Sequence, residues 1–341
     1  MPNNPTKILL STTLIGGILI SISSNSWLGA WMGLEINLMS FIPLMSSQEN
    51  IYTTEASLKY FIIQALASST LLFLVMMKAL TSQNLPLNSE MYEHAIMTPL
   101  LLKMGAAPLH WWFPSVMEGL SWENCLLMMT VQKAAPLVLI SYLTKMNIMT
   151  STIILASVII GALGGMNQTS LRKILTYSSI NHTGWMLTAT MGGDNLWALY
   201  FMVYSLLTSA VTVITKSFNI SFINQVMTAN SKTTIKFMLF TSLLSLGGLP
   251  PFIGFLPKWI VIQTMVANNL MMFIMTTMVI MSLVTLYYYL RMCYSTFMIL
   301  YEEMKWSYWS YQSSKTITYS TVLSSASLLG LTVCTMLTNI N

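Results

Sequence analysis

Long apolar stretches alternate with short polar connections along almost the whole chain. A helix needs roughly 20 apolar residues to cross the hydrocarbon core of a bilayer. The pattern predicts about eleven such spans, at 6–25, 26–46, 55–79, 91–117, 121–144, 148–167, 171–191, 194–219, 233–265, 268–299 and 316–339. The longest polar connection runs from Tyr301 to Lys315, which leaves no room for a domain outside the membrane.

Two of these spans carry glycines and prolines in their middle. The fourth contains LKMGAAP at 102–108, and the ninth contains GGLPP at 247–251. Proline removes a helix donor and clashes with the preceding turn. Backbone freed in this way is tolerated at membrane depth only where protein or a wet cavity satisfies it. Both spans are therefore expected to be broken helices.

The positions of the two breaks favour an inverted repeat. When the first ten spans are divided into two groups of five, each broken helix is the fourth of its group, and the two groups enter the membrane from opposite sides. Transporters with inverted repeats place their sites at such discontinuous helices. The division predicts a first repeat at 1–145, a second at 146–300, and a loop with a C-terminal helix at 301–341; two coincidental proline kinks are the alternative.

Composition agrees with a membrane protein of the all-α class. Of 341 residues, 55% are hydrophobic and 7% charged, whereas a soluble domain carries about 25% charged residues. The net charge of +5 is spread singly between apolar runs, so a nucleic-acid partner is not expected. Cys125, Cys293 and Cys334 are isolated and are interpreted as apolar packing residues.

The basic residues in the connections predict the orientation. With eleven crossings, the side of the N-terminus receives nine of them and the other side receives two, Lys78 and Lys145. The nine are Lys7, Arg172, Lys173, Lys216, Lys232, Lys236, Arg291, Lys305 and Lys315. By the positive-inside rule, the N-terminus lies on the cytoplasm-like side and the C-terminus on the other.

Four charged residues fall inside apolar spans without a nearby partner in sequence: Glu35, Lys103, Lys133 and Lys258. An isolated charge at the centre of a bilayer costs roughly 2.5–3.5 kcal/mol on insertion scales. Burial disfavours the charged form of a lysine and a neighbouring carboxylate favours it. A pair that forms and breaks would therefore switch proton affinity, so we expect a proton relay. Permanent salt bridges or snorkelling side chains are the structural alternative.

Three further residues are weaker relay candidates. Lys59 follows Glu55 by four residues, which also fits a local ion pair at a helix end. His182 lies among small polar residues that could hold water, and His110 precedes two tryptophans that could belong to an aromatic belt.

The chain contains no P-loop, dinucleotide fingerprint, cysteine cluster or paired haem ligands. Energy for pumping is therefore expected to come from a partner or from an ion gradient.

Seven stretches of the sequence form a recognisable set: WLGAWMGLEIN at 27–37, TEASLKYF at 54–61, LLKMGAAPLH at 101–110, QKAAP at 132–136, GGMNQT at 164–169 with LRK at 171–173, SSINHTGW at 178–185 and SLGGLPPFIGFLPKW at 245–259. On these stretches the chain resembles the mitochondrially encoded subunit 2 family of respiratory complex I, in an insect-like form. The resemblance thins only in the last forty or so residues.

The resemblance implies an antiporter-like fold with two inverted five-helix repeats. It implies that Glu35, Lys103, Lys133 and Lys258 form a buried charged axis that moves protons from matrix to intermembrane space in the mitochondrial inner membrane, with the N-terminus in the matrix. NADH, FMN, iron–sulfur clusters and ubiquinone would be held by partner subunits, and this chain would carry no redox site. Bacterial relatives begin with three further helices, whose place neighbouring subunits would take.

Two other functions fit part of the pattern. A stand-alone cation/proton antiporter would share the fold and the buried charges but not the sequence matches. A non-pumping scaffold subunit would keep its buried charges permanently paired.

Overall fold

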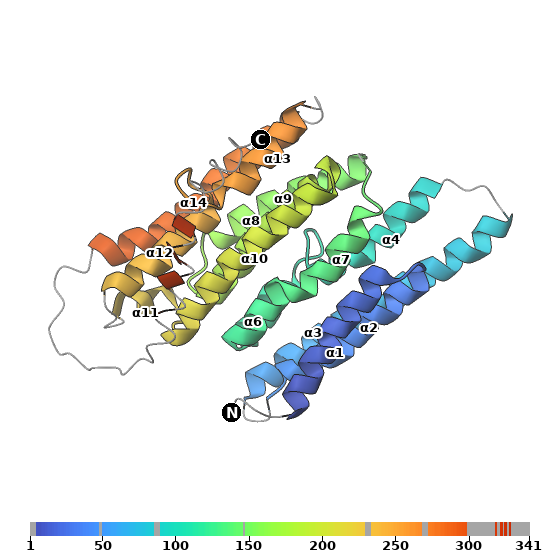
Figure 1. Ribbon diagram of the computed structural model, residues 1–341, viewed down its shortest axis with the longest axis horizontal. Helices are drawn as coiled ribbons and strands as arrows, with labels where there is room; N and C mark the ends of the chain where they lie inside the picture. Colours follow the sequence, from blue (N-terminus) through green and yellow to red (C-terminus); the bar gives the residue numbers. More distant parts are fainter. Residues whose placement is uncertain are drawn as a thin grey trace. The chain divides into compact units, whose positions relative to one another are not determined.

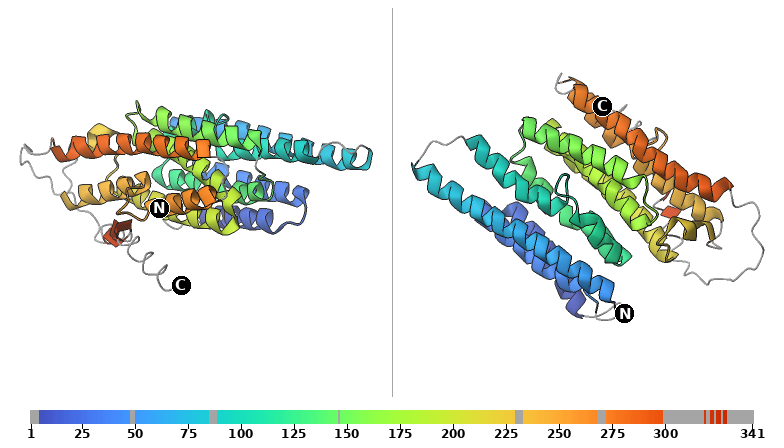
Figure 2. Two further views of the ribbon diagram at one scale, coloured as in Figure 1. Left: turned by 90° about the horizontal axis from the view of Figure 1, so that it is seen from above. Right: turned by 180° about the vertical axis from the view of Figure 1, so that it is seen from behind.

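The structure is a computed structural model that describes residues 5–47, 50–84, 89–145, 147–228, 233–267 and 272–298, and in the C-terminal segment residues 318, 321–322, 324–325 and 327–328. The predicted connection at 301–315 and most of the predicted span at 316–339 lie outside these residues. Contacts divide the chain into two compact units, residues 1–153 and 154–341. Each unit is a bundle of helices (Figures 1 and 2).

The first unit contains the helices α1 to α7 and the start of α8. In chain order these are α1 (Pro5–Ser23), α2 (Trp27–Met45), α3 (Ile51–Asn84), α4 (Ser89–Met104), α5 (Trp112–Gly119), α6 (Trp122–Met129) and α7 (Val131–Ser141). Helices α1, α2 and α3 pack side by side, and α3 also contacts α4 and α5 (Figure 1).

Small residues allow α1 and α2 to approach closely. A Cβ atom added to Gly33 would lie 2.5 Å from the backbone nitrogen of Ser21, and one added to Gly17 would lie 2.9 Å from that of Asn37. In lipid, where apolar side chains gain little by leaving the solvent, such close backbone packing holds helices together. These glycines therefore fix α2, the helix that carries Glu35, against α1.

The second unit contains the rest of α8 (Ile148–Gly165) and the helices that follow it. They are α9 (Leu171–Gly192), α10 (Asp194–Ser217), α11 (Ile223–Thr228), α12 (Thr233–Gly247), α13 (Phe255–Ala267) and α14 (Met272–Met298). Helix α9 is the centre of the unit, because 17 of its residues are buried, from Leu171 to Thr190. It packs against α10 and α13.

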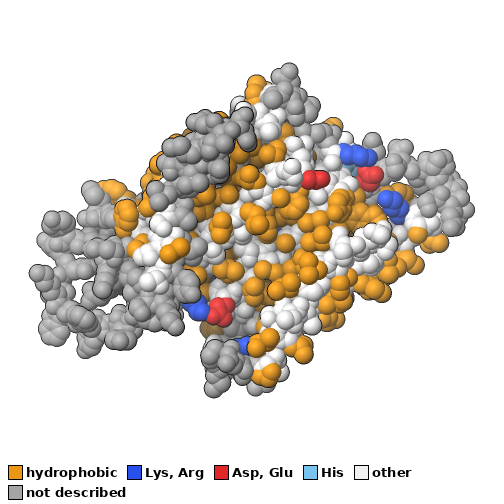
Figure 3. Space-filling view, viewed as in Figure 1, with side chains coloured by type: hydrophobic (Ala, Val, Ile, Leu, Met, Phe, Trp, Pro, Cys, Tyr) orange, Lys and Arg blue, Asp and Glu red, His pale blue; other side chains and the backbone are white. Residues whose placement is uncertain are grey.

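Seven helices in the described part of the chain are long and apolar enough to cross a membrane. They cover 5–23, 27–45, 51–80, 122–141 (α6 and α7 taken as one span), 148–165, 194–217 and 272–294, and the shorter helices at 236–247 and 255–266 are apolar as well. On the face drawn in Figure 3, hydrophobic side chains cover the middle of the helices and the visible charged side chains lie near helix ends. This distribution is that of a polytopic membrane protein of the all-α class.

Both predicted breaks are present. The fourth predicted span is divided into α4 and α5, and the ninth into α12 and α13. The fifth span, predicted as one helix at 121–144, is divided as well, since α6 ends at Met129 and α7 begins at Val131. Thr130 between them adopts backbone angles of φ −113° and ψ −75°. Its hydroxyl donates a hydrogen bond of 2.7 Å to the carbonyl of Leu126. Such a hydroxyl contact with the preceding turn bends helices.

Candidate functional site

Glu35 lies on α2, half-buried, at the wall of an open and mostly apolar groove of about 570 Å³. The groove runs between α1 and α2, and Leu9, Met32 and Met39 are among its lining residues. The Oε2 atom of Glu35 is buried and accepts no hydrogen bond from any residue that the structure describes. A buried carboxylate oxygen without a donor is costly, and no hydrogen bond from a described residue holds Oε2 in its position.

Lys103 lies in the last turn of α4, immediately before the first break. Its side chain is 8% exposed. The carbonyl groups freed by the break are satisfied by side chains, because the Trp112 indole donates to Leu102 at 3.1 Å and the Gln64 amide donates to the Lys103 carbonyl at 3.4 Å. Gly105 adopts φ +71° at the end of the helix, a conformation that glycine reaches without strain.

Glu35 and Lys103 interact electrostatically without touching. The charge of Glu35 acts on the Lys103 ammonium, but no ion pair within 4.0 Å joins the two described side chains. A small movement of either side chain therefore changes the stability of the charged lysine, since the Coulomb energy in a poorly polarisable interior changes steeply with distance.

A polar cavity lies beside Lys103. Its volume of about 10 Å³ is the room of about one water molecule. Four helices line it, with Leu34, Asn37 and Leu38 from α2, Tyr60 and Gln64 from α3, Lys103 from α4, and Gln132 and Pro136 from α7. The amides of Asn37 and Gln132 exchange two hydrogen bonds of 3.0 Å, and the Tyr60 hydroxyl lies 3.4 Å from the Gln132 Oε1.

Lys133 follows Gln132 in the first turn of α7 and is 2% exposed. Its Nζ lies 4.9 Å from the centre of the Phe113 ring on α5, where the electrons of the ring face attract a cation. The first unit thus places Glu35, Lys103 and Lys133 on helices that converge on or adjoin one polar cavity.

Lys258 lies in the first turn of α13, just after the second break, and is 5% exposed. Its Nζ donates to the Gly247 carbonyl at 2.9 Å and lies 5.7 Å from the centre of a Trp185 ring. Gly247 is the last residue of α12, and the C-terminal end of a helix attracts positive charge. The broken helix therefore supplies the group that holds its own lysine.

His182 lies in the middle of α9 and is also buried. One ring nitrogen, Nδ1, lies 2.8 Å from the Tyr200 hydroxyl on α10, and the ring packs against Tyr204 at 5.0 Å between centroids. His182 precedes Trp185 by less than one helical turn, so α9 carries both the histidine and the aromatic ring that Lys258 faces. In the second unit, α9 therefore carries His182 and also the Trp185 ring that Lys258 of α13 faces.

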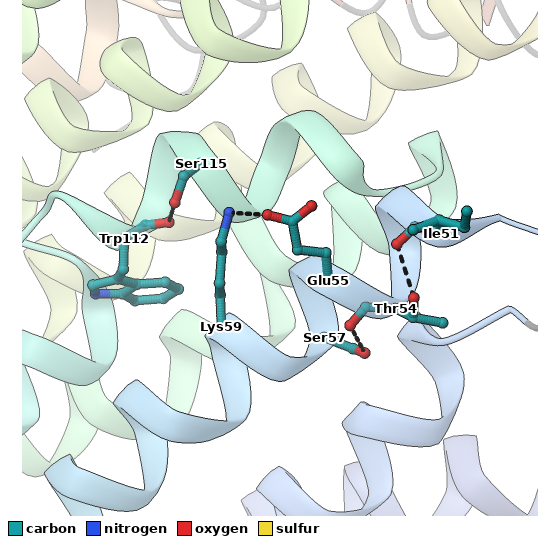
Figure 4. Close-up of polar contacts among 7 residues, drawn as sticks. All are labelled: Ile51, Thr54, Glu55, Ser57, Lys59, Trp112 and Ser115. Carbon is teal, nitrogen blue, oxygen red and sulfur yellow. Dashed lines mark hydrogen bonds and ion pairs between the residues drawn. The ribbon is translucent and has the colours of Figure 1, made fainter.

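The two remaining candidates have different surroundings. The predicted ion pair of Lys59 is confirmed, since its Nζ lies 2.6 Å from Glu55 Oε1 and both side chains are about half exposed (Figure 4). His110 is buried in the first break, stacked on Trp111, with its Nδ1 3.3 Å from the Pro108 carbonyl. Neither residue lines the cavity beside Lys103.

The sequence alone did not single out several buried polar groups. Lys236 was counted as a residue of a connection, but it lies on α12 and is only 6% exposed; its position inside the predicted span 233–265 was the available signal. The Asn37–Gln132 pair and the buried tyrosines near His182 were also missed, because neutral polar residues are unremarkable in a transmembrane sequence. Among the described residues, no three His, Cys, Asp or Glu side chains could together hold a metal ion.

The family model described as "NADH:quinone oxidoreductase/Mrp antiporter, TM" matches residues 24–285. Curated relatives cover nearly the full length. The NADH-ubiquinone oxidoreductase chain 2 of Anopheles gambiae is 51% identical over 327 residues, covering 95% of each chain. That of Locusta migratoria is 44% identical over 98% of this chain and 97% of its own, and that of Loxodonta africana is 38% identical over 96% of each.

The chain belongs to the NADH-ubiquinone oxidoreductase chain 2 family. Solved structures agree in fold. A chain of respiratory complex I from Thermus thermophilus matches with a TM-score of 0.84 and 22% identity, over 97% of this chain and 79% of that one. A chain of the Mrp complex from Dietzia matches with a TM-score of 0.76 and 17% identity, over 84% and 60%. The antiporter-like all-α membrane fold expected for the family is therefore confirmed.

Proposed function

We propose that this chain is a membrane-arm subunit of mitochondrial complex I that moves protons from the matrix to the intermembrane space. Its membership of the chain 2 family and the names of its relatives support the assignment. Electron transfer from NADH to ubiquinone takes place in partner subunits, which hold FMN and the iron–sulfur clusters, and this chain holds no redox centre. The N-terminus faces the matrix, as the distribution of basic residues indicates.

The protons pass over Glu35, Lys103, Lys133 and Lys258, with His182 as a further relay group. The observation that carries this proposal is the burial of three lysines in a bundle of membrane helices, two of them at breaks in those helices. Ionisable groups inside membrane proteins mark proton and ion pathways. A permanent structural role is the weaker interpretation, because Lys103 makes no ion pair with Glu35, the carboxylate whose charge acts on it.

The arrangement allows a simple switch at the first break. When the Glu35 carboxylate approaches Lys103, it stabilises the ammonium form and the lysine takes up a proton. When the carboxylate withdraws, the buried ammonium loses that stabilisation and releases its proton towards the polar cavity that Lys103, Tyr60 and Gln132 line. Lys133 follows Gln132, which lines this cavity, and is the next group to accept the proton.

The proposal is tested in the assembled complex with Lys103→Met and Glu35→Gln. Each variant removes one charge, and coupled NADH:ubiquinone turnover and proton uptake into proteoliposomes should both fall about tenfold, the effect of ~1.4 kcal/mol on the barrier of a limiting proton transfer. Lys145→Met is the matched control, because it removes a lysine whose ion pair with Glu93 lies at a helix end and whose side chain is 55% exposed.

Normal turnover and normal proton uptake in both variants would overturn the relay. A chain that merely scaffolds the complex would give lower amounts of assembled complex with unchanged turnover per complex. Sodium-dependent transport by the isolated chain in liposomes would instead support a stand-alone antiporter.

A further inference from the structure

Four buried tyrosines gather around the middle of the second unit and have no place in the relay described above. Tyr200 and Tyr204 lie on α10, and Tyr288 and Tyr289 lie on α14. Each is at most 2% exposed. Phenylalanine would fill the same space in a membrane core without burying a hydroxyl group, and buried hydroxyls require partners, so these four hydroxyls need an explanation.

The first link joins the cluster to His182. The Tyr200 hydroxyl lies 2.8 Å from the His182 Nδ1, and Tyr204, one helical turn further along α10, packs its ring on the same histidine. Tyr204 and Tyr289 also lie near enough to Tyr200 for a charge on either of them to act on the Tyr200 hydroxyl. His182 therefore lies at the edge of a group of tyrosine hydroxyls and not beside a single one.

The next links cross from α10 to α14 along α9. The Tyr204 hydroxyl lies beside Ser179, and the Tyr289 hydroxyl lies beside Ser178. Both serine hydroxyls donate to carbonyl groups of their own helix, Ser178 to Leu175 at 2.9 Å and Ser179 to Thr176 at 2.7 Å. A hydroxyl oxygen that donates in this way still carries lone pairs that can accept, and the Tyr204 and Tyr289 hydroxyls lie beside these oxygens without a hydrogen bond of standard geometry.

The last link is the pair Tyr288 and Tyr289. Their rings meet edge to face with centroids 4.6 Å apart, and the two residues are neighbours on α14. Neither hydroxyl makes a hydrogen bond of standard geometry with any described residue. Buried polar groups in this situation are usually satisfied by an ordered water, which would join the two hydroxyls into one chain.

The cluster extends from the middle of the helices to one of their ends. Ser178 and Ser179 lie one turn closer than His182 to the start of α9, where the Leu171 amide donates to the Ser221 carbonyl just beyond α10. The Tyr288 ring would lie 3.0 Å from a Cβ atom on Gly165, the last residue of α8.

One turn beyond Tyr288, the exposed Arg291 donates to the Gln168 carbonyl at 3.1 Å. The same end of the unit carries Arg172 in the first turn of α9. In the orientation proposed above, it faces the matrix.

We propose that Tyr200, Tyr204, Tyr289 and Tyr288, with Ser178 and Ser179, form a proton path between His182 and the helix ends at Arg291. The inference rests on the proposed function and gives it an entrance from the matrix. Each hydroxyl accepts a proton from one neighbour and donates its own to the next, so one proton enters at the Arg291 end and one reaches His182. The hydroxyls are neutral again after the transfer, and the positive charge lies on the imidazole of His182, which is an imidazolium until it passes the proton on.

The test removes hydroxyls and nothing else. Tyr204→Phe and Tyr289→Phe, singly and together, are made in the assembled complex. Tyr287→Phe is the matched control, because Tyr287 is the neighbour on α14 with a side chain 57% exposed. The double variant should lose proton uptake and coupled turnover about tenfold and show a larger slowing in D₂O than the parent complex, while the control keeps parental values in both measurements.

Normal turnover and a parental D₂O effect in the double variant would overturn the path. If Lys103→Met is impaired in the same assay, the proposed function survives that result; if Lys103→Met is also normal, both fail. Should the tyrosine variants reduce assembly, Ser178→Ala with Ser179→Ala removes the facing oxygens from α9, and parental proton uptake and a parental D₂O effect in that variant would equally overturn the path.

Discussion

At the scale of single residues, the amides of Asn37 and Gln132 are the most fully paired buried groups near Lys103. Each donates to the other at 3.0 Å, and the pair joins α2 to α7. Both side chains are at least nine-tenths buried. If one amide is removed, the other is left in the core without its partner, which costs about 1–3 kcal/mol.

This pairing predicts a distinctive pattern of stabilities. Asn37→Leu and Gln132→Met should each lower the temperature at which the subunit leaves the complex, since each leaves one buried amide unsatisfied. The double variant should dissociate at a temperature no lower than that of the less stable single variant, because neither buried amide is left without its partner. Native gels of heated complex measure the effect. Losses that simply add in the double variant would show that the two amides do not act as a pair.

How much of the site the sequence reveals depends on the charge of each residue. Lys103, Lys133 and Lys258 stand out because a charge in an apolar run has a large insertion cost, and all three are buried as predicted. Gln132 and Tyr204 do not stand out, because their role depends on neighbours distant in sequence. Lys236 was assigned to a connection by counting charges, although it falls inside the predicted span 233–265, and the packing of α12 buries it.

At the scale of helices, the breaks were predictable where glycine and proline cause them and not elsewhere. The divisions between α4 and α5 and between α12 and α13 follow from GAAP and GGLPP. The division at Thr130 contains neither residue, and the contact of the Thr130 hydroxyl with the preceding turn is also made by Thr208 and Thr215 within the undivided α10. The local sequence contains threonines in many intact helices, so it gives no warning of this break.

The second break also makes a testable contact between backbone and lysine. Gly248 adopts φ +82°, and a Cβ atom there would lie 3.0 Å from Lys258 Nζ. Gly248→Ala should therefore displace the ammonium from the Gly247 carbonyl and lower coupled turnover several-fold. Turnover per assembled complex is the measurement.

Gly193→Ala is the control for backbone strain. Gly193 adopts φ +132° but has nothing within 4 Å of an added Cβ atom, so alanine there costs strain of about 1–3 kcal/mol without touching a lysine. Equal losses of turnover in the two variants would mean that strain, and not the position of Lys258, causes the effect.

At the scale of the whole molecule, the residues of the proposed relay are divided between two compact units. Lys103 and Lys133 belong to the first and His182 and Lys258 to the second. A single path that uses both units in series predicts that interrupting either one stops transport. Two independent paths, one in each unit, predict that each interruption removes only its own share.

Lys133→Met and Lys258→Met distinguish these cases. For a series path, each single variant should reduce the number of protons moved per NADH to the level of the double variant, because a chain of transfers is stopped by one missing link. For independent paths, each single variant should lose part of the stoichiometry and the double variant should lose the sum of both parts. Proton uptake per NADH oxidised in proteoliposomes measures this directly. We expect the single and double variants to move the same number of protons per NADH. When groups act as one unit, removing one of them has nearly the same effect as removing all of them.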